Sequence, residues 1–274
     1  MERLREEALR TVRAAKTPDA VGAALETLPD GDAEVREVLL ARYRGLGAQP
    51  SRRDPGCHLR VALLQGLRRH ALPADVDVLE AAVRTYEMLP PGPQEVAGGL
   101  RAAALLALSD LDDRLASFHA VRLLADPYTS RLSGEPAVTA VRLLAAQGQA
   151  LPLYQHLLGQ EASGEVALEC LRALTEAPAS VVQALAEESR RRRDELVLLG
   201  LVDLLLGHPE KERLAPILIA LVTESEQMDV VRYAAAAIVA GREPTLIEGL
   251  RSRAGLAGRR GELVREALAL LPGG

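Results

Sequence analysis

The chain has 274 residues, of which 48% are hydrophobic, enough for one large core or two ordinary ones. These residues are almost all Leu, Ala and Val, with no Trp and one Phe. Because Ala and Leu favour helices, whereas aromatic residues favour strands, the composition predicts an all-α protein. A net charge of −5 and a pI of about 5.7 give no overall case for nucleic-acid binding.

The first residues, MERLREEALR, are charged and amphipathic, which excludes a secretory signal. The longest apolar stretch, LVLLGLVDLLLG at 196–207, contains Asp203 and is too short to cross a bilayer. Cys57 and Cys170 lie in no paired motif and are expected to be reduced thiols packed as small hydrophobes. These features predict a cytoplasmic protein with no cofactor and no membrane contact.

Amphipathic helical segments of about three turns follow one another along the chain, and no strand pattern is present. Most begin at a proline, which suits a first helical turn because its missing N–H would have no partner there. At 163–178 the polar residues fall at spacings of 4, 3 and 4. This pattern predicts a mostly buried helix with one solvent-exposed polar stripe. Pro216 lies within a segment and predicts a kink or a late helix start. The predicted starts are Pro73, Ser109–Asp110, Pro152, Pro178, Pro209 and Pro244.

A pair of residues, a large aliphatic followed by Arg, recurs about every 30 residues. Successive pairs lie 33, 41, 30, 31, 29 and 33 residues apart when Val202–Asp203 is counted among them. The motifs SGEPAV at 133 and SGEVAL at 163 are also 30 apart, and a long polar turn at 128–135 accounts for the 41-residue step. AVRLLA occurs at 120 and at 140, in the first and second helix of a two-helix unit. The pairs are Leu67–Arg68, Leu100–Arg101, Val141–Arg142, Leu171–Arg172, Val231–Arg232 and Val264–Arg265.

Two stretches, VRLLAAQG (141–148) and VRYAAAAIVAG (231–241), resemble the second helix of a HEAT repeat, and LLADP (123–127) resembles the end of its first helix with the Asp-Pro turn. The resemblance covers about residues 55–272, and residues 1–54 would be divergent cap helices. It implies one domain over 1–274, an α-solenoid with about six or seven stacked HEAT-like repeats, roughly 14–16 helices, and a right-handed superhelix. HEAT-like arrays mostly act as curved scaffolds. The resemblance therefore implies a non-enzymatic adaptor that binds another protein, with the concave side as the expected surface.

Two sets of arginines and one turn are candidates for the binding surface. The run SRRRRDE (189–195) could bind phosphates or an acidic partner. It could instead be a solvated turn in which the flanking carboxylates cancel the positive charge of the arginines. The recurring arginines could form a basic column. In HEAT-like repeats such arginines commonly pair with turn aspartates as a structural ladder, and Asp203 would suit neither role. The candidates are Arg190, Arg191, Arg192 and Arg193 in the run, Arg101, Arg142, Arg172, Arg232 and Arg265 in the column, and Tyr128 and Arg131 in the 128–135 turn.

No catalytic or metal motif is present in the sequence. The five histidines form no HExxH motif, and none is followed by Glu as in the HEAT-like deoxyhypusine hydroxylases. The acidic turn SDLDDR (109–114) is assigned to helix N-terminal charges. One alternative is a nucleic-acid-binding array related to the HEAT-like alkylpurine DNA glycosylases, which the net charge and the lack of base-stacking aromatics disfavour. The other is a phycobilin-lyase-type HEAT protein, which has no short motif to test.

Overall fold

The computed structural model describes residues 2–92, 94–159 and 163–271. Within these ranges the chain forms 17 α-helices, one 3₁₀ turn and a two-residue hairpin, so the predicted all-α class is confirmed. Helices pack mainly against those one or two places away in the chain order. The contacts divide the chain into two compact units, here called unit 1 (residues 1–144) and unit 2 (residues 145–274). None of the described helices combines the length and the hydropathy that a bilayer crossing requires.

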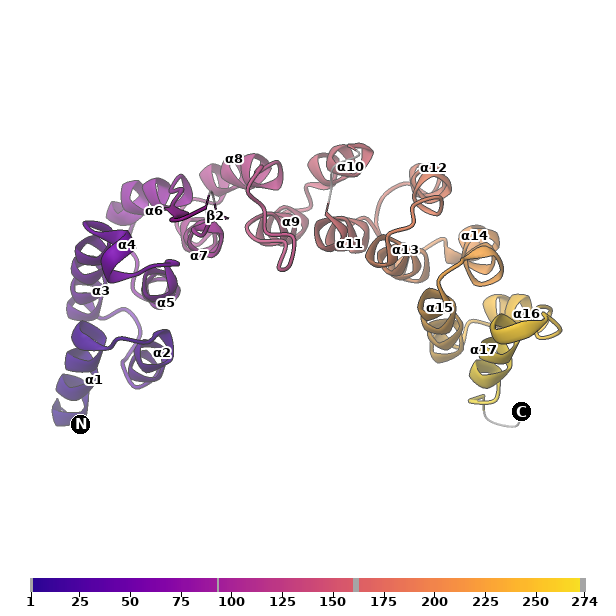
Figure 1. Cartoon of the computed structure of the whole chain (residues 1–274), viewed down its shortest axis with the longest axis horizontal. Coiled ribbons are helices and arrows are strands. Elements are labelled where there is room, and N and C mark those ends of the chain that lie inside the picture. The colour runs from indigo at the N-terminus through magenta and orange to yellow at the C-terminus, as the bar shows by residue number, and fades with distance from the viewer. Residues whose placement is uncertain (1, 93, 160–162, 272–274) are drawn as a thin grey trace. The chain divides into compact units, whose positions relative to one another are not determined.

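Unit 1 is built from α1 (Glu2–Ala14), α2 (Pro18–Glu26), α3 (Ala33–Gly47), α4 (Pro50–Arg53), α5 (His58–Leu67), the 3₁₀ turn η1 (Pro73–Asp75), α6 (Val76–Val83), α7 (Gly98–Ser109), α8 (Asp113–Leu124) and α9 (Ala137–Ala146), whose last residues belong to unit 2. Helices α2, α5 and α7 pack side by side in one row, and α1 packs against α3 in the other. Helices α6 and α8 both pack against α7 (Figure 1).

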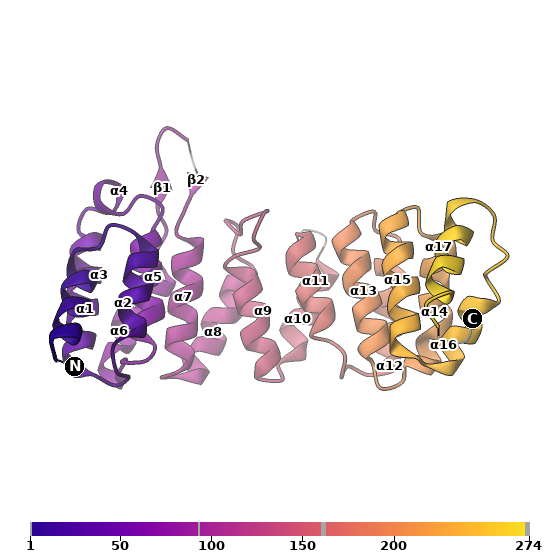
Figure 2. The same cartoon turned by 90° about the horizontal axis from the view of Figure 1, so that it is seen from below.

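A short antiparallel hairpin, β1 (Met88–Leu89) and β2 (Gln94–Glu95), lies between α6 and α7. The two strands lie beyond the ends of the neighbouring helices (Figure 2). No strand was predicted here, because two paired residues on each side are too few to produce an alternating pattern. The hairpin is held by buried arginines of the neighbouring row: Arg60 of α5 donates to Glu87, and Arg101 of α7 donates to Glu95.

Unit 2 contains α10 (Ala150–Leu158), α11 (Gly164–Arg172), α12 (Ala179–Ser189), α13 (Glu195–Gly207), α14 (Lys211–Glu224), α15 (Met228–Gly241), α16 (Pro244–Arg251) and α17 (Gly258–Leu268). Helices α11, α13, α15 and α17 contact one another in this order and form the odd row. Helices α12, α14 and α16 contact one another in the same way and form the even row. Each of these three also packs against odd-row helices, so the apolar residues of both rows share one core.

Three of the predicted helix starts hold and three do not. Pro244 is the first residue of α16, Pro178 is the N-cap of α12, and Pro73 opens the 3₁₀ turn before α6. By contrast, Pro152 is the third residue of α10, Pro209 precedes α14 by two residues, and Asp112, not Ser109–Asp110, is the N-cap of α8. Pro216 lies inside α14, which already begins at Lys211. Of the two alternatives predicted there, a kink or a late helix start, the late start is therefore excluded.

The six recurring aliphatic–Arg pairs and Val202–Asp203 fall on seven different helices, α5, α7, α9, α11, α13, α15 and α17, with Arg68 as the C-cap of α5. Their place within each helix varies, since Leu100–Arg101 lies in the first turn of α7 and Leu171–Arg172 in the last turn of α11. The two AVRLLA stretches close α8 and occupy α9, so they are on separate helices, as predicted.

Candidate functional site

The densest basic run forms the turn between α12 and α13, where the sequence placed it. Arg190–Arg193 follow the last turn of α12, at the end of the helix where positive charge is favoured. Asp194 then caps α13, since its Oδ1 accepts from the backbone N–H groups of Leu196 (3.0 Å) and Val197 (3.3 Å). The arginines are therefore carried on a short turn fixed between two helices.

The opposite wall of the site is the end of α14 and the turn that follows it. Arg190 Nη1 donates to Glu224 Oε2 at 2.8 Å, and Gln227 Nε2 donates to the backbone carbonyl of Arg193. Both contacts join residues that are 34 apart in the sequence. Sequence analysis did not single out Glu224 or Gln227, although the 30-residue recurrence brings them one step from the arginine run.

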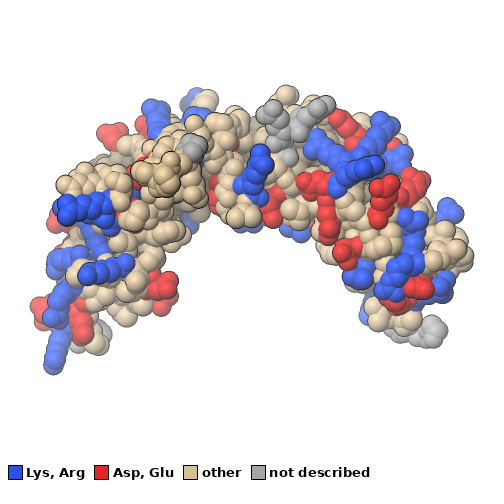
Figure 3. Space-filling model, in the orientation of Figure 1, with Lys and Arg blue, Asp and Glu red and all other residues tan. Residues whose placement is uncertain are grey.

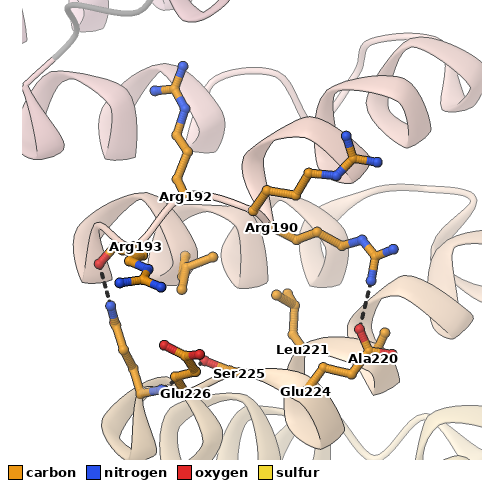
Figure 4. A pocket seen from close by; sticks show the side chains of 11 residues that line it. Arg190, Arg192, Arg193, Ala220, Leu221, Glu224, Ser225 and Glu226 are labelled. Carbon is orange, nitrogen blue, oxygen red and sulfur yellow. Dashed lines mark hydrogen bonds and ion pairs between the residues drawn. The ribbon is translucent and has the colours of Figure 1, made fainter.

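A cavity of about 540 Å³, here called the arginine groove, lies between these two walls (Figure 4). Leu198, Ala220 and Leu221 supply its apolar lining. In Figure 4 the side chain of Arg190 turns toward Glu224, whereas that of Arg192 points away from the α14 end. The remaining lining residues are Arg191, Arg193, Ser225, Glu226 and Gln227.

Two of the four arginines have partners within the fold. Arg190 is held on both sides, by Glu187 at 2.7 Å and by Glu224. Arg192 Nη2 donates to the backbone carbonyl of Leu157 at 3.2 Å, at the end of α10. This bond satisfies a helix-end carbonyl. It leaves the charge of Arg192 without a carboxylate partner among the residues that the structure describes.

Arg191 and Arg193 keep their guanidinium groups free of any ion pair to the described residues. Glu226 is the one lining carboxylate left to oppose them, because Glu224 already binds Arg190. The groove therefore retains positive charge, and Figure 3 shows Lys and Arg side chains gathered over this part of unit 2.

The arginine column is mostly paired with carboxylates. Arg172 Nε donates to Asp203 Oδ2 at 2.7 Å, and the Tyr233 hydroxyl donates to Asp203 Oδ1 at 2.5 Å. The bond to the carboxylate raises the pKa of Tyr233, because it favours the protonated phenol. Asp203 thus joins α11, α13 and α15, so the expectation that it interrupts a ladder is wrong.

The other column residues of the odd row are also engaged. Arg232 Nη1 lies 2.7 Å from Asp229 on its own helix, and Arg265 Nη1 donates to the carbonyl of Ala254 at 2.8 Å. Arg142 is exposed on α9, near the boundary of the two units. In unit 2 the column is a face of mixed charge and not a basic track.

Arg101 is buried and cannot contact a partner, so it leaves the candidate binding set. Its side chain is 0% exposed, with Nη1 2.8 Å from Glu95 Oε1 and Nε 3.1 Å from Asp126 Oδ2. Its guanidinium also lies 4.1 Å from the centroid of the Tyr86 ring. Asp126 follows α8, so the structural role considered for this arginine, pairing with a turn aspartate, is realised here.

A second buried arginine was missed. Arg60 Nε lies 3.0 Å from Asp54, and Nη1 lies 2.6 Å from Glu87. Leu59–Arg60 is itself an aliphatic–Arg pair and, like Arg101, lies near the start of its helix. The pair chosen from the sequence was Leu67–Arg68 at the other end of α5, where Arg68 binds Asp110 on the surface.

The 128–135 turn is present in unit 1. Two backbone bonds close it, from Ser130 N to Glu135 O at 2.9 Å and from Gly134 N to Ser130 O at 2.8 Å. Tyr128 is 46% exposed, and its ring packs edge-on against Tyr86 with centroids 5.8 Å apart. Arg131 is exposed on the same turn. Both candidates are thus accessible, and both lie outside the unit that holds the arginine groove.

The thiols and imidazoles give no sign of activated chemistry. Burial raises the pKa of Cys57 and of Cys170 to about 12, so both thiols stay protonated at neutral pH. Burial also lowers the pKa of His70, His119 and His156. Over the residues that the structure describes, no three His, Cys, Asp or Glu side chains are grouped to hold a metal ion.

No protein-family model, curated protein or solved structure matches the chain. The geometry of the odd row and of the arginine groove therefore carries the assignment of function.

Proposed function

We propose that this chain is a HEAT-like α-solenoid that acts as a non-enzymatic scaffold and binds another protein. Two features of unit 2 support this architecture. Each row is built by contacts between alternate helices, which is how two-helix units bury their apolar faces on their neighbours. The aliphatic–Arg pairs, moreover, fall on alternate helices of the chain.

Arg172, Asp203, Arg232 and Tyr233 belong to the odd row and are here called its open face. The observation that carries the function is that this surface holds charges of both signs. Arg172 and Arg232 are each matched by an aspartate, and Tyr233, whose hydroxyl binds the aspartate that pairs with Arg172, is 40% exposed. Phosphate backbones are bound by groups of Lys and Arg that neutralise several phosphates. Protein interfaces are instead enriched in aromatic residues and Arg, and they pair charges of opposite sign across the contact. This face therefore suits a protein partner better than a nucleic acid.

Affinity capture with quantitative mass spectrometry tests the proposal. Wild type is compared with Arg232→Glu/Tyr233→Ala on the open face and with the control Thr245→Ala/Arg251→Glu on α16 of the even row. The captured amount of a specific partner should fall about tenfold with the face variant, equivalent to about 1.4 kcal/mol of binding free energy. With the control variant the captured amount should be unchanged. Equal capture by all three proteins would show that the open face is not the binding surface.

A mobility-shift titration tests the nucleic-acid alternative. We expect no complex with duplex or single-stranded DNA or RNA even at low salt, where phosphate attraction is strongest. A complex that weakens steeply as salt is added would overturn the assignment of a protein partner.

A further inference from the structure

We infer that the arginine groove of unit 2 binds an acidic segment of a protein partner, one that carries an aliphatic side chain between its carboxylates. This inference rests on the proposed function and adds to it the site and the chemistry of the segment that is recognised.

The guanidinium groups supply the first part of this recognition. Arg191 and Arg193 have no carboxylate partner among the described residues. Within the same residues, Arg192 bonds to the backbone carbonyls of Leu157 and Gly159. A guanidinium presents a planar fork of donors that matches a carboxylate with two parallel hydrogen bonds. Two such groups, on Arg191 and Arg193, favour a segment with closely spaced carboxylates over a single anion.

The turn that carries these arginines is already fixed before a ligand arrives. Gln227 binds the carbonyl of Arg193, Arg190 is tied to Glu224, and Asp194 caps the following helix. A ligand therefore orders side chains but not backbone, which lowers the entropic cost of binding.

The apolar lining supplies the second part. Leu198, Leu221 and Ala220 form the apolar surface of the groove, here called its floor. Leu198 and Leu221 are each 4% exposed, so the packing of the core holds their side chains in place. The groove volume of about 540 Å³ lies within the range of about 300–1,000 Å³ that is typical of ligand pockets. An aliphatic side chain between the carboxylates would cover this floor, which a purely acidic segment would leave in contact with water.

A carboxylate on the far wall favours a peptide over a nucleic acid. Glu226 lines the groove opposite the arginines, and it is not the carboxylate that binds Arg190. A phosphodiester chain carries charge at every residue and would be repelled there. A peptide can place a neutral or basic residue beside this wall. The groove therefore favours a segment in which acidic residues alternate with residues that carry no negative charge.

Fluorescence anisotropy with a labelled short peptide of Asp and Glu around a central Leu tests this inference. Arg191→Glu/Arg193→Glu is compared with the control Arg251→Glu/Arg253→Glu, which makes the same charge change on exposed residues at the end of α16. Wild type should bind saturably, the groove variant about tenfold more weakly, and the control like wild type. A peptide with Ser in place of the Leu should bind more weakly to wild type. Circular dichroism confirms that both variants are folded.

Three outcomes would overturn the inference. Equally weakened peptide binding in the groove variant and the control would mean that the peptide is attracted by the net charge of the protein and not by the groove. Tighter binding of a labelled single-stranded oligonucleotide would mean a phosphate site. A lack of saturable peptide binding to folded wild type would exclude the groove as an acidic-peptide site. The first and third outcomes leave the open-face capture experiment untouched, so the proposed function can survive them. The oligonucleotide outcome also counts against the proposed protein partner, and the capture experiment distinguishes the two failures.

Discussion

Arginine supplies nearly all the basic charge of this chain, in which Lys16 and Lys211 are the two lysines, and much of it is used inside the fold. The last carbonyls of a helix have no partner within that helix and carry partial negative charge. Arginines from the next part of the chain donate to them repeatedly, and the long fork of a guanidinium suits this task. The bonds run from Arg42 to Val12 and Ala15, from Arg122 to Val83, from Arg192 to Leu157, and from Arg260 to Ser225 just beyond α14.

Removing the buried Arg101 should be far more costly than removing an exposed arginine. Arg101→Met leaves Glu95 and Asp126 buried without their cation, which is expected to lower the free energy of unfolding by about 3–5 kcal/mol. The control is Arg172→Met, whose side chain is 46% exposed and whose ion pairs are expected to contribute about 0–1 kcal/mol. Urea unfolding of the three proteins measures both changes. Similar losses for the two variants would contradict the structural role of the buried cluster.

At the scale of elements, the odd row depends on a close approach of two helices. A Cβ built on Gly200 of α13 would lie 2.9 Å from the Cα and 3.1 Å from the carbonyl oxygen of Leu168 in α11. The contact is with backbone, so neither helix can yield by turning a side chain. Glycine is therefore used here for proximity, in spite of its low helix propensity.

A Gly→Ala substitution should lower the free energy of unfolding in α13 and raise it in α2. Gly200→Ala is expected to destabilise the protein by about 1–3 kcal/mol, because α11 and α13 must move apart. Gly22→Ala in α2 meets no atom within 4 Å and should stabilise by about 0.5–1 kcal/mol through helix propensity alone. Thermal and urea unfolding give both signs. Stabilisation by both substitutions would show that the α11–α13 contact is looser than described.

At the scale of the whole molecule, buried histidines in both units link stability to pH. Burial lowers the pKa of His70, His119 and His156, and for His119 it outweighs the opposing effect of Glu80, whose Oε1 lies 3.2 Å from Nε2. The folded state therefore holds these rings neutral, whereas the unfolded chain protonates them near pH 6.5. Their contribution to stability is complete above that pH and is lost as the pH falls below it.

The free energy of unfolding should consequently decrease between pH 7 and about pH 5, before most carboxylates titrate. Urea unfolding at a series of pH values measures the slope. His156→Gln removes a half-buried ring on α10 and should flatten the slope, whereas Gln155→Ala, an exposed neighbour with no titratable group, should leave it unchanged. A slope that is the same in all three proteins would contradict this origin of the pH dependence.

Helices and turns could be predicted because their signals are local. Proline or an N-cap residue begins a segment, and the spacing of apolar residues marks its buried side, so the all-α class and the position of Arg190–Arg193 between two helices followed from short windows. The hairpin at 88–95 was missed because it is held by Arg60 and Arg101, which come from two other helices.

The sequence by itself determined the helical class, the recurrence of about 30 residues and the basic turn, since each depends on residues close together in the chain. Only the tertiary structure decided which arginines are free. Arg101 and Arg191 look alike in the sequence, but folding brings Glu95 and Asp126 to the first, whereas the second keeps its charge uncancelled beside the groove. The physical reason is that a charge is neutralised by its neighbours in space, and those neighbours belong to elements far along the chain.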